Sequence, residues 1–159
     1  MKKYLQITCS IILTMMTFSL HAQTINIPDA YFLEALINGG VDTNNDEEIQ
    51  ENEALAIDTL DISDYGISNL AGIEYFKNIK YLNCNYNGIS ALDFSIFPNL
   101  EYIDCSNNSF SSLDVSSLTK LQYLNCGSNQ LTNLNVSDLT NLQTIHCYFN
   151  KLTNLDVSG

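Results

Sequence analysis

Between Asp42 and Glu53 the sequence places oxygen-bearing side chains at nearly every second position, a pattern that can coordinate a metal ion. Carboxylate, amide and backbone carbonyl oxygens are the ligands that a hard cation such as Ca²⁺ prefers, whereas softer metals favour thiolate or imidazole. The candidate ligands are Asp42, Asn44, Asp46, Glu48 (through its backbone carbonyl), Gln50 and Glu53. Calcium is therefore the one cofactor that the sequence suggests, and none is required.

This segment matches the ligand positions of an EF-hand loop, with the apolar Ile49 at the eighth position. It departs at the sixth position, where the sharp turn needs Gly and the chain has Glu47. A residue with a Cβ held at positive φ costs about 1–2 kcal/mol. A solvated acidic loop that caps a helix without binding an ion therefore remains an alternative. If calcium binds, we expect a Kd of about 10⁻⁴–10⁻³ M, as in extracellular modules.

Four cysteines recur every 21 residues, namely Cys84, Cys105, Cys126 and Cys147. Ligands in a single column cannot surround one zinc ion tetrahedrally. In stacked parallel strands such side chains lie about 4.8 Å apart and point the same way, which suits poorly the Cβ separation of about 3.8 Å and the dihedral of a disulfide. We expect a buried ladder of free thiols, with two disulfides as the alternative in a secreted chain.

Residues that could catalyse a reaction are scarce. His146 is the only histidine after the first 22 residues, and no nucleophile elbow or oxyanion motif accompanies it. Carboxylates are many, but none lies in an apolar stretch of the kind that sets up general acid catalysis. The sequence therefore predicts a protein that is not an enzyme.

A repeat positions all these residues. Asparagines keep the same step of 21 residues as the cysteines, and so do several apolar columns, giving the unit L-x-x-L-x-C-x-x-N-x-L. A looser copy runs from Ile57 to Leu70, with Tyr65 in place of the asparagine. The asparagine column consists of Asn87, Asn108, Asn129 and Asn150. A fixed period of this length indicates a solenoid, because one unit cannot bury its own apolar face.

Each unit predicts a short strand followed by a turn. Alternation around Leu82 and Cys84 directs these side chains inward, and the column asparagine can bond to backbone groups at the turn and in the next coil. The second half of the unit, such as residues 131–137, is rich in Thr, Val and Ser and should be extended or turn-like rather than helical. The predicted fold is a mainly β repeat solenoid whose strands form a parallel concave sheet.

The units resemble the leucine-rich repeats of secreted Bacteroidota proteins and the cysteine-ladder repeats of internalin-type surface proteins. The resemblance covers residues 57–159, about five repeats of which the last is incomplete, and a related layout extends to about residue 25. It implies a leucine-rich-repeat coil stack in a surface or secreted interaction module, often part of a longer adhesin. Internalin-type proteins also have a helical N-terminal cap that resembles an EF-hand without a functional site.

In such a stack the residues that flank the inward-facing pair form columns on the concave sheet. Tyrosines dominate the first column, and short polar residues occupy the second. Tyr combines a flat apolar face with a hydrogen-bonding tip, which suits protein surfaces and sugar rings alike, although tyrosines also simply fill sheet surfaces. The candidate ligand-binding residues are Tyr81, Tyr102, Tyr123, Asn83, Asp104, Asn125, His146, Tyr148 and Phe149.

Two segments precede the repeats. Residues 1–22 have the layout of a secretory signal peptide, with Lys2 and Lys3, a short apolar run and the small residue Ala22 at the cleavage point. Residues 23–56 form an acidic cap, in which a helix begins near Pro28 and Asp29, ends at Gly39 and Gly40, and is followed by the acidic loop and a second helix. The chain ends inside a repeat, so we expect it to be part of a longer protein.

Charge narrows the choice of partners. The chain has 18 acidic and six basic residues, a net charge of −12, and no arginine. Nucleic acid and anionic membrane surfaces are therefore poor partners, and the apolar run of the signal peptide is too short to insert as a membrane span. The sequence predicts a secreted or cell-surface interaction module that binds a protein or glycan through its concave face. The alternative is a calcium-stabilised structural component of a larger surface protein, with no ligand of its own.

Overall fold

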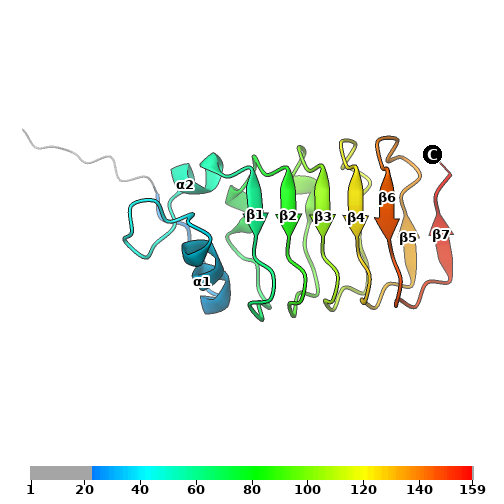
Figure 1. The fold of residues 1–159 in the computed structure, drawn as a ribbon, viewed down its shortest axis with the longest axis horizontal. Coiled ribbons are helices and arrows are strands. Elements are labelled where there is room, and N and C mark those ends of the chain that lie inside the picture. Colours follow the sequence, from blue (N-terminus) through cyan, green and yellow to red (C-terminus); the bar gives the residue numbers. More distant parts are fainter. Residues whose placement is uncertain (1–22, 159) are drawn as a thin grey trace, which may run out of the picture.

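The computed structural model describes residues 23–158, in which repeated coils stack along one axis behind a small helical region (Figure 1). The signal peptide predicted for residues 1–22 lies outside the described residues. Each coil brings one short strand to the same side of the stack. These strands form a parallel sheet of five, in the order β1 (Thr59–Asp61), β2 (Tyr81–Asn83), β3 (Tyr102–Asp104), β4 (Tyr123–Asn125) and β6 (Thr144–His146). The predicted repeat solenoid of about five turns with a parallel sheet is confirmed.

The register follows the repeat because the period places equivalent residues on neighbouring coils. Leu60 pairs with Leu82, Leu82 with Ile103, and so on to Ile145 in β6. The first four of these side chains are buried, and so are the cysteines two positions later in the second, third and fourth coils. Aligned apolar columns thus form one continuous core along the stack, as nearest-neighbour packing of repeats requires.

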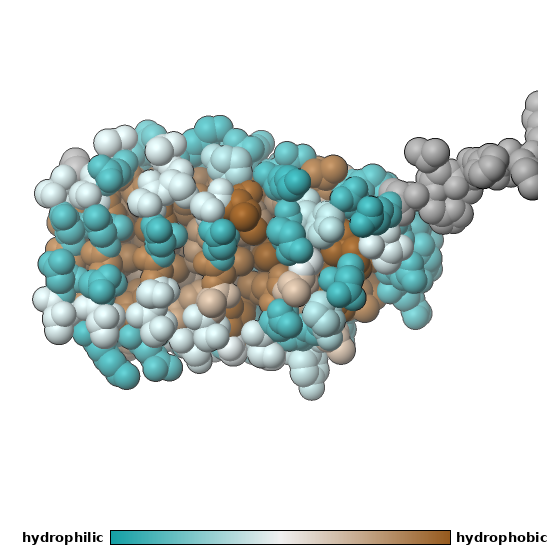
Figure 2. Space-filling view, turned by 180° about the vertical axis from the view of Figure 1, so that it is seen from behind, coloured by the Kyte–Doolittle hydropathy of each residue, from teal (hydrophilic) through white to brown (hydrophobic). Residues whose placement is uncertain are grey.

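The second half of the coils contains no α-helix within residues 59–158, as predicted. It carries two 3₁₀ turns, η1 (Ile73–Tyr75) and η2 (Phe94–Ile96), and then a second, two-stranded parallel sheet of β5 (Asn133–Asn135) and β7 (Asn154–Asp156). Viewed from behind, hydrophilic side chains stand in rows above an apolar interior (Figure 2). No helix within residues 23–158 has the length and apolar character that a membrane crossing requires.

The column asparagines hold consecutive coils together. The Asn129 side chain accepts a hydrogen bond from Phe110 N–H (3.0 Å) and donates to the carbonyls of Cys105 (3.0 Å), Cys126 (3.2 Å) and Gly127 (3.3 Å). Equivalent bonds are made by Asn87, Asn108 and Asn150. One amide therefore satisfies backbone groups in its own turn and in the preceding coil, which the turn would otherwise leave buried and unpaired.

The helical region covers the first coil. It contains α1 (Ala30–Asn38) and α2 (Glu51–Ala56), which agree with the two predicted helices. Asp29 caps α1 by accepting bonds from the N–H groups of Tyr31 and Phe32, and its second oxygen accepts bonds from the N–H groups of Ser68 and Asn69. A single carboxylate therefore ties the start of α1 to the turn of the first coil.

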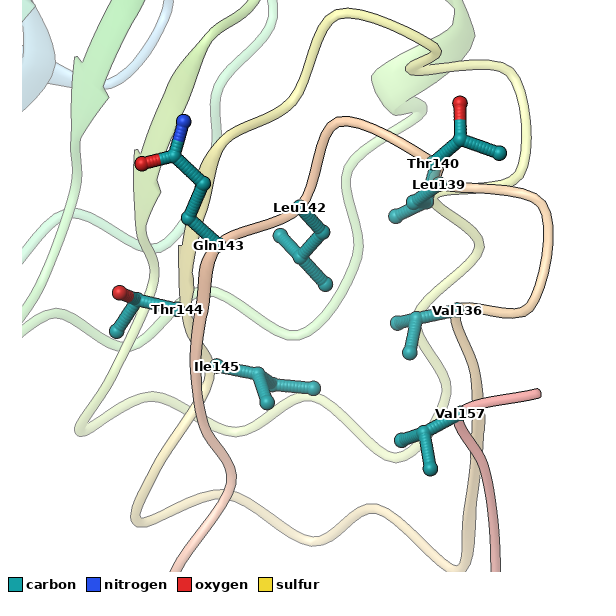
Figure 3. A pocket seen from close by; sticks show the side chains of 8 residues that line it. All are labelled: Val136, Leu139, Thr140, Leu142, Gln143, Thr144, Ile145 and Val157. Atoms are coloured by element: carbon teal, nitrogen blue, oxygen red, sulfur yellow. The ribbon is translucent and has the colours of Figure 1, made fainter. Parts of the chain in front are cut away.

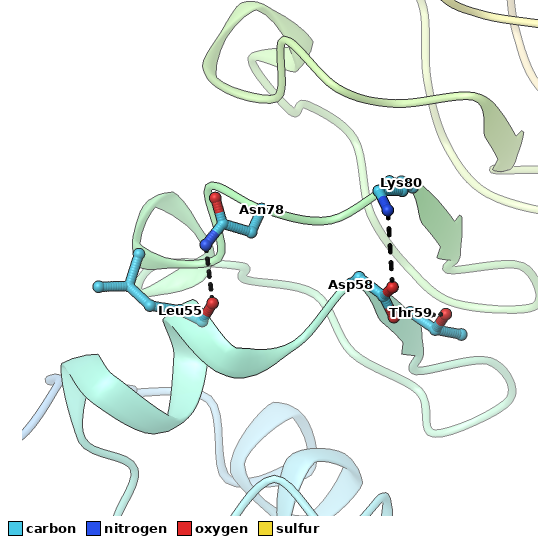
Figure 4. A network of polar contacts seen from close by, with 5 residues as sticks. All are labelled: Leu55, Asp58, Thr59, Asn78 and Lys80. Carbon is cyan, nitrogen blue, oxygen red and sulfur yellow. Dashed lines mark hydrogen bonds and ion pairs between the residues drawn. The ribbon is translucent and has the colours of Figure 1, made fainter.

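Two further contacts lie near this junction (Figure 4), one from α2 to the repeats and one between the first two coils. The Asn78 side chain donates to the carbonyl of Leu55 in α2 (2.7 Å), and Lys80 pairs with Asp58 at 3.8 Å. Both charged side chains of the ion pair are exposed, so it contributes little stability. Gly72 has φ 102°, and a Cβ there would lie 2.9 Å from Ile27, so only glycine lets these segments approach so closely.

At the far end of the stack the apolar interior opens between the last two coils. A cavity of 180 Å³ is lined mainly by Val136, Leu139, Leu142, Ile145 and Val157 (Figure 3). Val157 is 60% exposed, whereas the corresponding residue of the preceding coil, Val136, is 6% exposed. The contrast shows how much of each coil's burial depends on having a neighbour on both sides.

Candidate functional site

Three tyrosines form a stack on the outer face of the five-stranded sheet. The rings of Tyr81 and Tyr102 lie 4.2 Å apart at 10°, and those of Tyr102 and Tyr123 lie 4.3 Å apart at 1°. This close parallel arrangement follows from the in-register pairing of β2, β3 and β4. Burial in the stack raises the pKa of the Tyr102 hydroxyl, with the neighbouring Tyr81 adding to the effect, so this phenol is neutral at physiological pH. The inner ring faces contact each other, which leaves edges and hydroxyl groups for a partner.

A column of alternating acids and amides runs beside the tyrosines. Asn83 donates to Asp61 (3.1 Å), and Asn125 donates to Asp104 (3.0 Å). Asp104 also accepts bonds from the N–H and hydroxyl of Ser106. Asp104 and Asn125 are each only 8% exposed, so these predicted site residues are less open than a surface column would be. Their bonds to one another join neighbouring coils and limit what they can offer a partner.

Three rings continue the tyrosine stack toward the last coil by edge-to-face contacts. The ring centroids lie 5.7 Å apart for Tyr123 and His146, 6.2 Å for His146 and Tyr148, and 5.5 Å for Tyr148 and Phe149, which are perpendicular at 90°. We call Tyr148 and Phe149 the aromatic corner. The structure therefore brings the predicted aromatic residues into one continuous strip: Tyr81, Tyr102, Tyr123, His146, Tyr148 and Phe149.

The aromatic corner depends on two backbone features. The Tyr148 ring lies over Gly127, where a Cβ would come within 2.8 Å of it, so only glycine leaves room for this ring position. Phe149 has φ 52°, in the left-handed region that is rare for a bulky residue. The turn imposes this conformation on every coil, since the equivalent residues Tyr86, Asn107 and Ser128 have φ between 51° and 55°.

The role of Gly127 was not evident from the sequence alone. It appears there as one member of the column Asn85, Ser106, Gly127 and Tyr148, in which a small residue precedes a large one. In this column the polar side chains of Asn85 and Ser106 give way to a glycine, and a tyrosine follows one coil later. This change is the sequence signal for an aromatic ring that packs over the backbone.

The acidic loop adopts the turn that the EF-hand pattern needs. Glu47 has φ 63°, so the position that expects glycine is in the left-handed region despite its Cβ. Asp42 accepts bonds from the N–H groups of Asn45 (2.7 Å), Asp46 (3.3 Å) and Glu47 (2.9 Å), which hold the turn. The loop also joins the chain before α1, because Ile25 N–H donates to the Ile49 carbonyl (2.7 Å).

The candidate ligand side chains are engaged with hydrogen-bond donors of the protein. The Gln50 amide donates to both oxygens of Asp46, and the Asn44 amide donates to Asp46 and to the side-chain oxygen of Gln50. Glu53 accepts bonds from Thr43 and from Gln50 N–H, at the start of α2. Burial raises the pKa of the Glu53 carboxyl, but these bonds outweigh burial and lower the pKa below its usual value.

Glu48 reaches away from these groups, since its carboxylate accepts a bond from the Thr24 hydroxyl (2.9 Å). Within residues 23–158 no three His, Cys, Asp or Glu side chains gather in a way that could hold a metal ion. Binding an ion in this loop would require Gln50 and Glu53 to exchange their present partners for it.

The cysteines form a ladder of free thiols, as predicted. Cys84, Cys105 and Cys126 are buried, and Cys147 is half-buried in the last coil. Burial raises the pKa of Cys84 and of Cys126 to about 12, and that of Cys105 well above its usual value, with the adjacent thiols adding to the effect at Cys105. These cysteines therefore pack as small apolar residues rather than act as nucleophiles.

Thiol titration should reflect this gradient. At pH 8 we expect Cys147 to react with a disulfide reagent well before the other three, because a thiol with a pKa of about 12 carries roughly a thousandth of the thiolate of an ordinary cysteine. In denaturant and without reductant all four should react in a protein that begins at Gln23 and therefore lacks Cys9. Recovery of fewer thiols from Cys84, Cys105, Cys126 and Cys147 would mean that disulfides form after all.

The comparisons agree with this architecture. Residues 98–140 match the family described as Leucine Rich repeats (2 copies). None of the curated proteins matches the chain significantly. The chain is similar to the functional domain of InlJ from Listeria monocytogenes, which includes a cysteine ladder, with 34% identity and a TM-score of 0.73 over 86% of this chain and 31% of that one. The chain thus spans about a third of the length of that domain.

Two further solved structures share the fold at lower identity. Internalin C2 from L. monocytogenes has 23% identity and a TM-score of 0.63, over 85% of this chain and 78% of that one. An internalin described as inlF, from the same organism, has 22% identity and a TM-score of 0.62, over 79% of this chain and 45% of that one. The described part of this chain is therefore a leucine-rich-repeat solenoid with a small helical N-terminal region, similar in structure to Listeria internalins.

Proposed function

We propose that the chain is a secreted or cell-surface interaction module, and that it binds a protein or glycan partner through the outer face of its five-stranded sheet. The observation that carries this proposal is the aromatic strip, which runs across four neighbouring coils on one face. Aromatic residues are enriched in protein interfaces because they offer apolar area together with hydrogen-bonding tips. Leucine-rich-repeat proteins commonly bind other proteins, which is consistent with this use of the sheet.

The same features argue for binding without catalysis. Three of the four described thiols are buried, only Cys147 is half-buried, and His146 contacts the rings of Tyr123 and Tyr148, so no described cysteine is paired with this base. Relatives with this fold are typically interaction domains without enzymatic activity. We therefore propose a role in recognition at the cell surface or outside the cell.

Binding should depend on the middle of the aromatic strip. The experiment screens the immobilised chain against purified surface proteins and a glycan array, and then measures each binder's affinity for the Tyr102→Ala variant. We expect a loss of roughly 5- to 30-fold, about 1–2 kcal/mol, which lies between the loss for an ordinary contributing contact and that for a hot spot. Tyr31→Ala is the matched control, because Tyr31 is an exposed tyrosine on α1, away from the sheet. Binders that tolerate Tyr102→Ala but not Tyr31→Ala would move the binding surface to the helical region and reject the proposal.

We also propose that calcium can stabilise the helical region, the alternative structural role for this chain. The observation in favour is the left-handed conformation of Glu47, which gives the loop the turn that calcium loops need. With a Kd of about 0.1–1 mM, 10 mM Ca²⁺ should raise the free energy of unfolding by about 1.4–2.7 kcal/mol. The measurement is thermal unfolding in CaCl₂ and in MgCl₂ at equal ionic strength, with Asp46→Ala as the control variant. An equal effect of the two salts, or no shift, would remove the calcium role.

A further inference from the structure

We propose that the aromatic corner, Tyr148 and Phe149, is the anchor of the sheet face and receives an arginine or lysine side chain of a partner protein. This inference rests on the proposed function, since it names the chemistry of the partner that the same face would bind. It selects a protein with exposed basic residues over a neutral glycan.

Open ring faces distinguish the aromatic corner from the rest of the aromatic strip. Tyr81, Tyr102 and Tyr123 stack face to face at 4.2 and 4.3 Å, so their inner faces are already covered. Phe149 is 82% exposed and Tyr148 is 51% exposed, and their perpendicular rings present faces in two directions. A cation binds over an aromatic face, where the ring quadrupole is negative, and a guanidinium can stack there as well.

The aromatic corner is held in place rather than left as a loose pair of side chains. Gly127 provides the space in which the Tyr148 ring lies, and His146 contacts the same ring at 6.2 Å. Phe149 occupies a left-handed position where Asn or Gly would be less strained, and yet projects a large apolar side chain into solvent. The turn imposes the left-handed conformation on every coil, so it is the large exposed side chain of Phe149 that sets this coil apart from the two before it, which have Asn107 and Ser128 at this position.

The charge of the same face favours a cation. Asp61 and Asp104 lie in the strand column beside the tyrosines, and Glu101 directly precedes Tyr102. The single ion pair among residues 23–158, Lys80 with Asp58, involves none of these three acids. Their side-chain partners are neutral amides and hydroxyls, since Asn83 donates to Asp61, Gln122 to Glu101 and Asn125 to Asp104.

Neutral donors leave the negative charge of these carboxylates in place, and the chain has no arginine and a net charge of −12. Asp104 and His146 belong to strands two coils apart, about 10 Å along the sheet. A partner segment with one basic residue on the aromatic corner and a second about 10 Å along the sheet, where the partly exposed Glu101 precedes β3, would match this pattern. Three residues of extended chain span that distance.

The test uses the peptide Gly-Arg-Gly-Gly-Arg-Gly, with blocked ends, and an analogue in which citrulline replaces both arginines. Binding is followed by isothermal calorimetry and by the NMR signals of the tyrosine and phenylalanine rings. We expect the arginine peptide to shift the ring signals of Tyr148 and Phe149, and the citrulline peptide to bind much more weakly. Phe149→Ala should weaken arginine-peptide binding about 3- to 30-fold, the range for one cation–π contact.

Gly127→Ala is the more selective variant because it removes no contact residue. It should displace the Tyr148 ring and weaken binding of the arginine peptide, while the urea midpoint of unfolding stays near that of the parent. Gly88→Ala is its matched control, since a Cβ there meets the Ile67 carbonyl at an ordinary 3.5 Å, and this variant should bind like the parent.

Several outcomes would overturn the inference. If Phe149→Ala and Gly127→Ala both bind the arginine peptide like the parent, the net negative charge of the chain alone attracts the peptide. If the citrulline analogue binds as tightly as the arginine peptide, the aromatic corner does not distinguish a cation from a neutral side chain. A neutral chitin hexasaccharide that shifts the Tyr148 and Phe149 signals when the arginine peptide does not would also overturn it, yet would leave the proposed function standing. A natural partner whose binding is weakened by Tyr102→Ala but not by Gly127→Ala would likewise overturn this inference and leave the proposed function standing.

Discussion

Replacing Asn129, the most buried residue of the asparagine column, by alanine is expected to lower the free energy of unfolding by about 3–5 kcal/mol. The substitution deprives Phe110 N–H of its acceptor and three carbonyls, those of Cys105, Cys126 and Gly127, of their donor. Asn129 is 8% exposed, and a buried backbone group without a partner costs about 1–3 kcal/mol. Urea unfolding monitored by circular dichroism gives the free energy.

Two variants test the origin of this loss. Asn129→Asp keeps an acceptor for Phe110 N–H but has no amide to donate to the carbonyls, so it should be nearly as unstable as the alanine variant. Gln130→Ala changes the exposed neighbouring residue and should lie within about 0.5 kcal/mol of the parent. An Asn129→Ala variant that lost less than about 1 kcal/mol would show that water replaces the amide, and that the asparagine column is not what joins the coils.

The asparagine column was predictable because the period fixes it. A residue that returns to the same place in every coil must meet the same backbone groups each time, so Asn87, Asn108, Asn129 and Asn150 could be assigned one structural role from spacing and side-chain chemistry. The same reasoning gave the buried cysteines, the in-register strands and the extended second half of the coils. Short-range rules were sufficient for α1, since Asp29 and Gly39 mark its ends.

Side-chain geometry in the candidate site was not predictable in this way. The period places Tyr81, Tyr102 and Tyr123 in one column but does not specify the torsions that stack their rings, nor that stacking covers the faces a sugar ring would need. In the acidic loop the spacing of oxygens suggested ligands, but the Gln50 amide turns toward Asp46, a choice that depends on several side-chain torsions at once. The spacing of residues in the sequence identifies which side chains lie close together. Their side-chain torsions determine which ring faces and hydrogen-bonding groups remain accessible to a ligand.

Long-range contacts from the helical region were equally invisible in the sequence. The sequence identifies Asp29 as a helix cap but does not indicate its bonds to Ser68 and Asn69. These bonds join residues 39 and 40 positions apart, and Asp29 lies outside the repeats whose period predicts the other long-range contacts. These bonds make Asp29 more important than an ordinary cap, because the helical region and the first coil share one carboxylate. The same logic implies that the helical region unfolds together with the first coil rather than alone.

Asp29→Ala is accordingly expected to cost about 2–4 kcal/mol at pH 7. Loss of the cap accounts for about 0.5–2 kcal/mol, and the N–H groups of Ser68 and Asn69, which lose their acceptor in a partly buried turn, account for the rest. Asp29→Asn is the matched variant, since it retains one oxygen for α1 or for the first coil but not both, and should fall between parent and Asp29→Ala. Urea unfolding at pH 7 measures all three.

The pH dependence separates this carboxylate from a merely well-packed side chain. Burial raises the pKa of Asp29, but the four N–H groups that it accepts from outweigh burial, so the pKa in the folded protein lies below its value in the unfolded chain. A carboxyl of this kind stabilises the fold fully above its unfolded pKa of about 3.9, and the contribution is lost as the pH falls through the lower, folded value. Glu53 shares this direction and persists in both variants, so the difference between parent and Asp29→Ala isolates Asp29. That difference should be constant from pH 7 to about pH 5 and shrink below about pH 4. A difference that stayed constant down to pH 2 would show that packing, and not the ionised carboxylate, joins α1 to the first coil.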